Sequence, residues 1–483
     1  MSEAGALDRE STGSQAAPTR NGPGALVLLC GVQLMLLLDF SIVNVALPSM
    51  ETSVGLGAVG TQWVVGAYAL GFGSLLLLGG RLSDLLGRRL MLVVGVSAFG
   101  VASLVGGLAT TPALLIAMRA LQGVGAALIA PAALSLITTG YPDEAERNRA
   151  LGWFSAATAS GFAIGVLLGG ILTELAGWRA VFFVNVPLTA AAVLAAFRVL
   201  PSVAPGARAG RAYDLPGVLL SAAGFVALIN GLSQVPADGR HAAVSITAGV
   251  ALLVVFVVVE SRSSAPLVPL GIFRSRALSV ANGASFLIPG VMGTTALQLS
   301  LFLQQVQGRS ALSTGFAFLP LGLSVAVAGP LSAAAAGRFG PKIVCVTGGA
   351  LVSAGVLLLS RIEADSGYAG GVLPGTLLMG LGFAAFFSTA MMAATAGVPE
   401  RQQGVAGGLL NTFQQVGTAA FVAIMVSLAT ARTDSLGAAT PEHQAEGFQT
   451  AFTVGAMVAV ATTVLVAVGL PGRRPAAPTA TIS

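Results

Sequence analysis

Residues Gly24–Pro48 read GALVLLCGVQLMLLLDFSIVNVALP, and this stretch decides the fold. It is apolar almost throughout, and about twenty apolar residues are enough for a helix to cross a bilayer. A single carboxylate, Asp39, lies inside it. Because an ionisable side chain at membrane depth is costly, it marks a candidate functional site. The stretch therefore predicts a membrane-spanning helix with Asp39 as its functional residue.

The rest of the chain has the composition of a membrane protein. Of its 483 residues, 55% are hydrophobic and 9% are charged, whereas soluble proteins carry about 25% charged residues. The mean hydropathy of +0.87 agrees with this. The 63 glycines lie within the apolar runs, where small residues allow helices to pack closely. We expect a polytopic membrane protein.

Fourteen apolar spans follow one another along the sequence. Only a helix satisfies its own backbone hydrogen bonds in lipid, and the alternating pattern of a membrane barrel is absent from the sequence. The predicted fold class is an all-α polytopic membrane protein with fourteen transmembrane helices. The spans are residues 24–48, 58–80, 89–110, 113–139, 149–172, 179–199, 214–233, 243–260, 277–304, 312–336, 342–360, 370–396, 404–430 and 449–470.

The basic residues predict how the chain is threaded. Of the 24 Lys and Arg residues, 18 fall on the side of the N-terminus, five fall on the other side, and Arg119 lies within a span. Because basic residues concentrate on cytoplasmic loops, both termini are predicted to be cytoplasmic. The first residues are polar and lack the pattern of a signal peptide. Every basic residue except Lys342 is arginine, which favours a bacterial source and therefore the inner (cytoplasmic) membrane.

The loops divide the chain into two halves and an insert. Long polar segments at 200–213 and 261–276 bracket the seventh and eighth spans. Two similar halves that face each other across a central cavity are a common transporter plan. The predicted parts are a disordered cytoplasmic tail (1–23), an N-terminal six-helix half (24–200), a linker with two extra transmembrane helices (201–276), a C-terminal six-helix half (277–470) and a cytoplasmic tail (471–483).

Several classes of function lack the chemistry that they need. The net charge of +5 comes from arginines scattered singly between the spans, so a nucleic-acid-binding stripe is not predicted. Cys30 and Cys345 lie within apolar spans, which gives a disulfide no support. His241 and His443 fall in outer loops, and the sequence has no metal-ligand cluster, phosphate-binding loop or nucleophile–base motif. We expect neither an enzyme nor an ATP-driven pump, and neither a metal nor a cofactor.

A charged loop with two glycines joins the second and third spans. It reads GRLSDLLGRR, residues 80–89, and the glycines permit a tight turn. Asp84 can meet cations or a helix N-terminus of the opposite half; a topology signal with an incidental acid is the alternative. The loop resembles the loop 2–3 signature of the major facilitator superfamily, G-x-L-a-D-r-x-G-r-[RK]. The resemblance implies a cytoplasmic gate formed by Gly80, Asp84, Gly87, Arg88 and Arg89.

The first span carries a longer resemblance. Residues 38–48, LDFSIVNVALP, resemble the L-D-x-T-I-V-N-V-A-L-P signature of the fourteen-helix drug/proton antiporter branch of that superfamily, with Ser41 in place of threonine. By position, Asp39 takes the role of the family's acid, which is associated with proton coupling or with binding of cationic drugs. The alternative is a neutral buried acid that bonds Ser41 or Asn44 for packing alone.

An arginine in the fourth span is the predicted partner of Asp39. Residues 115–127, LIAMRALQGVGAA, resemble the helix 4 signature of the branch and contain Arg119. Asp39 lies about 13 Å along its helix before Pro48, and Arg119 lies about 10 Å after Pro112, so the two share a similar depth. The guanidinium favours the carboxylate while burial favours the protonated acid. The pair is predicted to load and release a proton; a static ion pair is the alternative.

The fifth and sixth spans carry two further motifs. Residues 161–170, GFAIGVLLGG, resemble the antiporter signature g-x-x-x-G-P-x-x-G-G, with Val166 where the family has proline. The glycines are predicted to allow close helix packing, without the kink that a proline imposes. Residues 178–187, WRAVFFVNVP, resemble the W-R-W-i-F-x-i-N-v-P turn of the branch, which we interpret as structural. The packing glycines are Gly161, Gly165, Gly169 and Gly170.

Polar and aromatic residues within or near the spans are candidates to line a substrate cavity, because such mixed side chains line most ligand sites. The C-terminal half has no acidic residue deep in a span, so a second coupling acid is not predicted. For any single candidate, ordinary interhelical hydrogen bonding or packing is the alternative. The candidates are Asn44, Gln62, Trp63, Tyr68, Gln122, Asn282, Phe286, Gln298, Gln304, Gln305, Asn411, Gln414 and Gln415.

The resemblance implies a proton-coupled antiporter that exports small amphipathic or cationic drugs or antibiotics by alternating access. The proton motive force would drive it, and we expect a monomer in the lipid bilayer. A dedicated exporter of a self-made metabolite or antibiotic is one alternative. A non-transporting membrane scaffold or sensor on the same fold is another.

Overall fold

The computed structural model describes residues 21–201, 215–235, 238–263, 266, 268, 270–395, 398, 400–437 and 440–471. Every regular element within these ranges is a helix. In chain order they are α1 (Pro23–Val54), α2 (Gly57–Leu86), α3 (Arg88–Gly107), α4 (Pro112–Gly140), α5 (Glu144–Ala176), α6 (Ala180–Phe183), α7 (Asn185–Val199), α8 (Leu215–Gln234), α9 (Gly239–Arg262), η1 (Leu270–Arg274), α10 (Arg276–Leu301), η2 (Phe302–Val306), α11 (Ala311–Phe339), α12 (Pro341–Leu359), η3 (Tyr368–Val372), α13 (Leu373–Thr395), α14 (Glu400–Ser435) and α15 (Pro441–Gly469).

Fourteen helical spans among the described residues are long and apolar enough to cross a membrane. This confirms the predicted fold class, and the chain is a membrane protein. One span, Ala180–Val199, combines α6 and α7. Its break at Val184 has a cause in the sequence, because Pro187 has no N–H to donate to the carbonyl of Phe183. The two predicted tails fall almost entirely outside the described residues.

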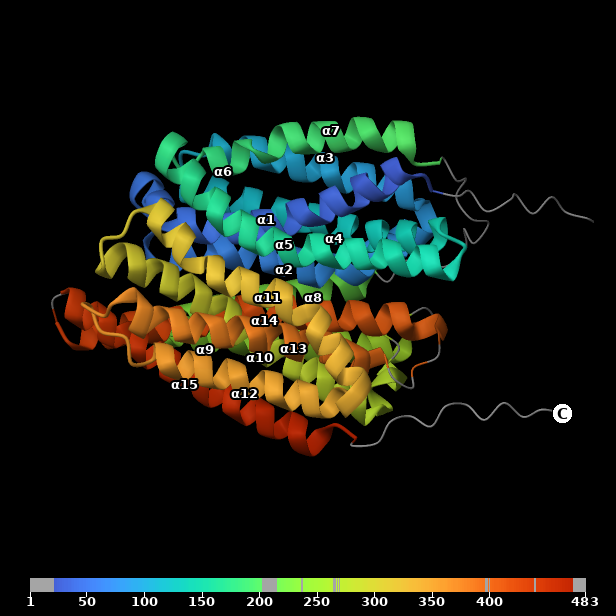
Figure 1. The fold of residues 1–483 in the computed structure, drawn as a ribbon. Coiled ribbons are helices and arrows are strands. Elements are labelled where there is room, and N and C mark those ends of the chain that lie inside the picture. The colour runs from blue at the N-terminus through green and yellow to red at the C-terminus, as the bar shows by residue number, and fades with distance from the viewer. Residues whose placement is uncertain are drawn as a thin grey trace, which may run out of the picture.

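The helices form a bundle in which the early and late parts of the chain gather separately (Figure 1). α1 packs against α5 and α7, and α4 packs against α2 and α3. In the later part, α12 packs against α13 and α15, while α10 packs against α14. The two groups meet where α5 contacts α11, α2 contacts α14 and α1 contacts α10. The division into two six-helix halves stays a prediction. Two such halves, packed against each other, would show this pattern of contacts.

The two helices between these groups lie on the outside of the bundle. α8 contacts both α2 and α14, and its Ile229 packs in one apolar cluster with Leu70 and Ala420. α9 packs on α8 where Gly249 meets the backbone at Leu228, and most of its apolar length stays exposed. The pair therefore covers the line along which α2 meets α14.

The start of α1 at Pro23 and the end of α15 at Gly469 lie at the same end of the bundle, which we call the terminal end (Figure 1). The opposite end, where α1 finishes at Val54, is the far end.

Several helices run beyond the predicted spans. α1 continues through Pro48 to Val54, and α14 and α15 occupy most of the segment 431–448, which the sequence predicts as a loop. A hydropathy pattern detects only the apolar part of a helix, so polar turns at a helix end are missed. α1 passes Pro48 because another helix satisfies the carbonyl that proline leaves without a donor, as described below.

Candidate functional site

Asp39 lies in the middle of α1, and its side chain is completely buried. Arg119 lies on α4, seven residues after Pro112, and is 1% exposed. The first turn of α4 is fixed by Thr111, whose side chain accepts from the Leu114 N–H. Arg119 Nη1 lies 2.7 Å from Asp39 Oδ2. The two residues that the depth argument pairs are thus in direct contact.

Two amides complete the surroundings of the Asp39 carboxylate. Gln122 Nε2 donates to Asp39 Oδ1 at 3.0 Å, and Asn185 Nδ2 donates to the same oxygen at 2.7 Å. Gln122 lies one turn after Arg119 on α4, and Asn185 is the first residue of α7. The carboxylate therefore receives three donors from two helices, all of them buried.

Arg119 is held by contacts besides its ion pair. Its Nε donates to the backbone carbonyl of Val64 at 3.0 Å, and its Nη1 also donates to Gln122 Oε1 at 2.9 Å. The guanidinium carbon lies 4.5 Å from the centre of the Tyr68 ring, a cation–π distance. α2 thus contributes a hydrogen bond and a ring contact to the arginine.

A second layer of hydrogen bonds orients Gln122. Its Nε2 also donates to Ser103 Oγ at 2.8 Å, and that hydroxyl donates to the Phe99 carbonyl at 2.8 Å. Because every polar atom of the Gln122 amide is used, its orientation is fixed. We call Asp39, Arg119, Gln122, Asn185 and Ser103 the Asp39 network.

The Asp39 network is costly to build. Taking a carboxylate and a guanidinium out of water costs several kcal/mol per ion, so a buried ion pair is weak evidence for added stability. Buried, coupled ionisable groups are instead frequent at functional sites. Among the described spans, all other acidic residues lie toward helix ends. Asp39 is therefore the one carboxylate placed midway across a described span.

The predicted gate residues make their described contacts within the early group of helices. Asp84 is largely exposed and lies 4.0 Å from Arg88. Arg88 also donates to Thr139 Oγ1, and Arg89 Nη2 donates to the Phe197 carbonyl at 3.0 Å. Gly87 joins α2 to α3 with φ 104°, a conformation that favours glycine, and Gly80 faces Pro131 of α4. In the described residues, the predicted link from Asp84 to the opposite half is not formed.

Arg81 of the same motif reaches further. Its Nη1 donates to the Pro266 carbonyl at 3.2 Å, in the segment that follows α9. Val268 and Ile272 of that segment pack in an apolar cluster with Leu409 of α14 and Leu77 of α2. The segment after α9 thus joins α2 to α14 at the terminal end.

The predicted packing glycines of α5 lie against two neighbours. A Cβ built on Gly161 would lie 2.8 Å from the Leu37 side chain, and one on Gly165 would lie 2.6 Å from the Leu38 carbonyl. Gly169 faces Ile42 in the same way, whereas Gly170 faces Ala311 of α11. α5 therefore contacts α1 on one side and α11 of the later group on the other.

Among the described residues, the substrate candidates lie in several separate environments. Gln122 belongs to the Asp39 network, and Tyr68 contacts the arginine of that network. Trp63 and Phe286 pack in the apolar cluster with Ile229 of α8. Gln298 Nε2 donates to the Met425 carbonyl at 2.8 Å, and it joins α10 to α14. These five residues have packing or bonding roles in this conformation.

Gln298 and four other candidates keep an unpartnered polar atom. Within the described residues, Oδ1 of Asn44 and Asn282 and Oε1 of Gln62, Gln298 and Gln414 are buried without a hydrogen-bond partner. Asn411 bonds within its own helix, to the Gly407 carbonyl, and Gln415 is buried beside Gly73 of α2. Unpartnered buried atoms of this kind call for a water, a ligand or another conformation.

The far end is closed by bonds between α1 and the end of α10. Pro48 lacks the N–H that would bond the Asn44 carbonyl within α1, and Ser300 Oγ donates to that carbonyl at 3.0 Å instead. Gln304 Nε2 donates to the Val45 carbonyl at 3.1 Å, and Gln305 Nε2 to Glu51 Oε2 at 3.0 Å. Both glutamines lie in η2, a π-turn. We call these three bonds the far-end clasp.

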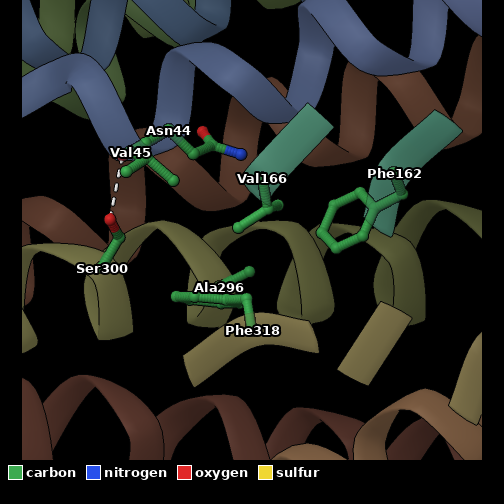
Figure 2. Close-up of a pocket in the computed structure, with 7 residues that line it drawn as sticks. All are labelled: Asn44, Val45, Phe162, Val166, Ala296, Ser300 and Phe318. Carbon is green, nitrogen blue, oxygen red and sulfur yellow. Dashed lines mark hydrogen bonds between the residues drawn. The ribbon is translucent and has the colours of Figure 1, made fainter. Parts of the chain in front are cut away.

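A small space lies beside the far-end clasp, between α1, α5, α10 and α11 (Figure 2). Figure 2 shows Asn44 on one side, Ala296 and Phe318 on the other, and Val166 with Phe162 along it. The space leaves no room for a water-sized sphere, whereas typical ligand pockets enclose about 300–1,000 Å³. This meeting point of both groups is therefore closed in the present conformation.

A larger cavity of about 830 Å³ opens at the far end, between the loop after α12 and the start of α15. Its lining includes Glu363, Asp365, Glu442 and Glu446, with Arg432 in an ion pair to Glu446 at 2.9 Å. It contains no residue of the Asp39 network. Across the residues that the structure describes, no group of His, Cys, Asp or Glu is arranged to hold a metal.

Asn185 is the residue of this site that the sequence interpretation missed. It belongs to the WRAVFFVNVP motif, which we interpreted as a structural turn. The depth count that pairs Asp39 with Arg119 also applies to it, since Asn185 lies six residues after Arg179, about 9 Å into its span. The signal was present in the sequence.

Comparison with known proteins agrees with this architecture. The sequence is 39% identical to the puromycin resistance protein pur8 of Streptomyces alboniger, over 96% of this chain and 93% of that protein. It is 36% identical to the cephamycin export protein CmcT of Amycolatopsis lactamdurans, over 90% of both. The lincomycin resistance protein of Streptomyces lincolnensis is 34% identical over 87% of both.

Solved structures share the fold at low sequence identity. A D-xylose–proton symporter superposes with a TM-score of 0.66 at 13% identity, covering 93% of this chain and 98% of that one. A bacterial homologue of the lysosomal transporter Spinster, inward-facing and unoccupied, gives 0.65 at 16% identity, covering 92% and 96%. The family described as the Major Facilitator Superfamily matches residues 29–422. The chain, with its fourteen candidate spans, belongs to the major facilitator superfamily.

Proposed function

We propose that the protein is a proton-driven exporter of small amphipathic or cationic drugs or antibiotics, which works by alternating access. The observation that carries this proposal is Asp39, fully buried midway along α1 and bonded by Arg119, Gln122 and Asn185. An ionisable group at that depth, with its charge balanced by one neighbour, is suited to take up and release a proton. Neither an enzyme's chemistry nor a cofactor is involved.

The relatives support a small-molecule substrate. Three of them are named for resistance to, or export of, puromycin, cephamycin and lincomycin. We infer that the substrate of this chain belongs to the same broad class of small antibiotics.

In the proposed cycle, protonation of Asp39 and binding of the substrate exclude each other. A proton from outside loads Asp39, and its release inside resets the site, so the inward proton gradient drives efflux. The halves 24–200 and 277–470 rock about the centre, and the far-end clasp forms and breaks. In the state closed at the terminal end, the gate residues Gly80, Asp84, Gly87, Arg88 and Arg89 contact the opposite half.

We place the protein in the inner membrane of a bacterium, as a monomer in the lipid bilayer with both termini in the cytoplasm. The terminal end then faces the cytoplasm and the far end faces outside. The support is the excess of arginines in the loops of the terminal end.

A dedicated exporter of a single compound is the second candidate. It is favoured by the names of several relatives, which specify one antibiotic each. A non-transporting scaffold is disfavoured, because a scaffold has no need for a costly buried ion pair.

The test is uptake driven by a proton gradient into inside-out membrane vesicles. A fluorescent lipophilic cation and puromycin are offered to vesicles with the wild type or with Asp39→Asn, which replaces the carboxylate by an uncharged group of the same shape. We expect the wild type to accumulate substrate, a protonophore to abolish the accumulation, and Asp39→Asn to be inactive at equal expression.

Normal transport by Asp39→Asn would place proton coupling elsewhere and overturn the proposal. If the wild type moves puromycin but no cationic dye, the dedicated exporter is the correct version. Asp434→Asn, at the end of α14 away from the Asp39 network, serves as the matched control and should transport normally.

A further inference from the structure

Of the two amides that bond Asp39, only Asn185 has an oxygen without a partner in the described part of the chain. Its side chain is completely buried. An unpartnered buried acceptor costs about 1–3 kcal/mol, so the presence of this oxygen beside a carboxylate needs an explanation.

When Asp39 takes up a proton, its O–H needs a hydrogen-bond acceptor, which the neighbours other than Asn185 cannot provide. An ionised carboxylate only accepts hydrogen bonds, whereas a protonated one has an O–H that needs an acceptor. Arg119 can only donate. The oxygen of Gln122 already accepts from Arg119, and its nitrogen donates to both Asp39 and Ser103. A turn of the Gln122 amide would break all three bonds.

Asn185 can turn at the loss of one bond. Its nitrogen donates only to Asp39, and its oxygen bonds nothing in the described residues. A half-turn about Cβ–Cγ exchanges the two atoms. The amide then accepts where it had donated.

We propose that Asn185 is a positioning residue that satisfies both protonation states of Asp39. This inference rests on the proposed function. With Asp39 ionised, Asn185 Nδ2 donates to Asp39 Oδ1; when a proton adds to that oxygen, the Asn185 amide turns and its Oδ1 accepts from the new O–H. Gln122 keeps its bond to Asp39 Oδ1 and Arg119 keeps its bond to Oδ2. The proton is the only atom that joins the site.

Few ionisable groups lie near Asp39 in the described part of the chain. Arg119 of α4 and Tyr68 of α2 are the titratable residues that face Asp39. On the described parts of α5, α7, α10 and α11, which also pack against α1, the charged residues lie toward the helix ends, and α6 carries none.

The test is the pH dependence of binding of a lipophilic cation, tetraphenylphosphonium, to the purified full chain. We expect Asn185→Leu to move the midpoint upward by about one to two pH units, which is a ten- to hundredfold rise in proton affinity. The ionised form loses a charge-assisted bond, and such bonds are stronger than the neutral bond lost by the protonated form. Asn185→Ser should shift less, because a hydroxyl can donate or accept.

The matched control is Thr189→Val, one turn further along α7. Thr189 is 4% exposed and its hydroxyl donates only to backbone carbonyls of Asn185 and Val186. It should titrate like the wild type. An Asn185→Leu midpoint equal to that of the wild type would overturn the inference.

If Asn185→Leu does not fold, infrared difference spectra of the wild type test whether the Asn185 amide turns. Acidification should shift the amide C=O band of Asn185, identified by its loss in Asn185→Ser, together with the carboxyl band of Asp39. An amide band that stays in place overturns the inference. An Asp39→Asn protein that keeps the wild-type midpoint would instead refute the proposed proton switch, whatever Asn185 does.

Discussion

At the residue scale, the Asp39 network balances one carboxylate with one guanidinium and two amides. Arg119 does more than supply charge: it bonds Asp39, Gln122 and the Val64 backbone, and it lies over Tyr68. A planar guanidinium has several donors in a fixed fork, whereas a lysine ammonium is a compact point charge. The geometry of the site therefore depends on arginine and not merely on a positive charge.

We predict that Arg119→Lys lowers the proton-driven transport rate at least tenfold. The variant keeps the charge but loses the fork, and each hydrogen bond to a charged group contributes about 1.5–3 kcal/mol. Initial rates in vesicles at equal expression measure the effect. Arg309→Lys is the control, because Arg309 also lies over a tyrosine ring, Tyr368 at 5.7 Å, but at the far end. Wild-type rates for Arg119→Lys would refute this role.

The sequence predicts the pair at this scale but not the complete network. Asp39 and Arg119 share a depth that counting residues reveals. Gln122 is predicted as a substrate contact, and the structure shows that it also bonds Asp39. Asn185 lies at a similar depth, but depth alone does not specify which face of its helix meets Asp39, 146 residues away.

At the element scale, α1 carries both the buried acid and half of the far-end clasp. Pro48 frees the Asn44 carbonyl, and Ser300 of α10 supplies the donor. Proline normally breaks a helix because one backbone carbonyl is left without a donor. Here that carbonyl accepts a hydrogen bond that joins the two groups of helices. The π-turn η2 brings Gln304 and Gln305 to α1 in the same region.

We predict that Ser300→Ala opens the far end and that Pro48→Ala restores it. Ser300→Ala leaves the Asn44 carbonyl buried without a donor, a cost of about 1–3 kcal/mol, which shifts a two-state equilibrium about 5- to 150-fold. In the double variant, residue 48 supplies an N–H to that carbonyl within α1. Distances between spin labels at Thr52→Cys and Ser313→Cys, with Cys30 and Cys345 replaced by serine, report the opening.

The control for this experiment is Ser353→Ala on α12. Its hydroxyl is also buried, but it bonds only the Gly349 carbonyl of its own helix, so the label distances should not change. Equal distances in Ser300→Ala and the wild type would mean that the clasp does not hold the far end closed.

Element boundaries are predicted less well than element number. All fourteen spans follow from hydropathy, whereas the clasp depends on a π-turn that shifts the register of two glutamines by one residue. Such a shift leaves no trace in composition or periodicity. The role of Pro48 was equally hidden, since its consequence depends on a serine 252 residues later in the chain.

At the scale of the whole molecule, one carboxylate midway across the bundle limits the charge that a cycle can move. Exchange of one proton for one monovalent cation moves no net charge. Exchange of one proton for a neutral substrate moves one positive charge inward.

We predict that membrane potential drives export of neutral substrates but not of monovalent cations, and that dications are handled poorly. One charge in a potential of 100 mV corresponds to about 2.3 kcal/mol, or about fiftyfold in accumulation. Proteoliposomes with potassium gradients and valinomycin set the potential independently of pH. A dication coupled to protons as tightly as a monocation would contradict the single-acid scheme.

The position of α8 and α9 has a consequence for how such a chain can evolve. α8 covers the line where α2 meets α14, and α9 packs on α8 with most of its length exposed. Without the pair, Leu70 and Ala420 would face lipid tails, which are as apolar as the side chains that cover them now. A gene could therefore gain or lose this hairpin by a single insertion or deletion between its halves, and the packing around Asp39 would need no compensating mutations.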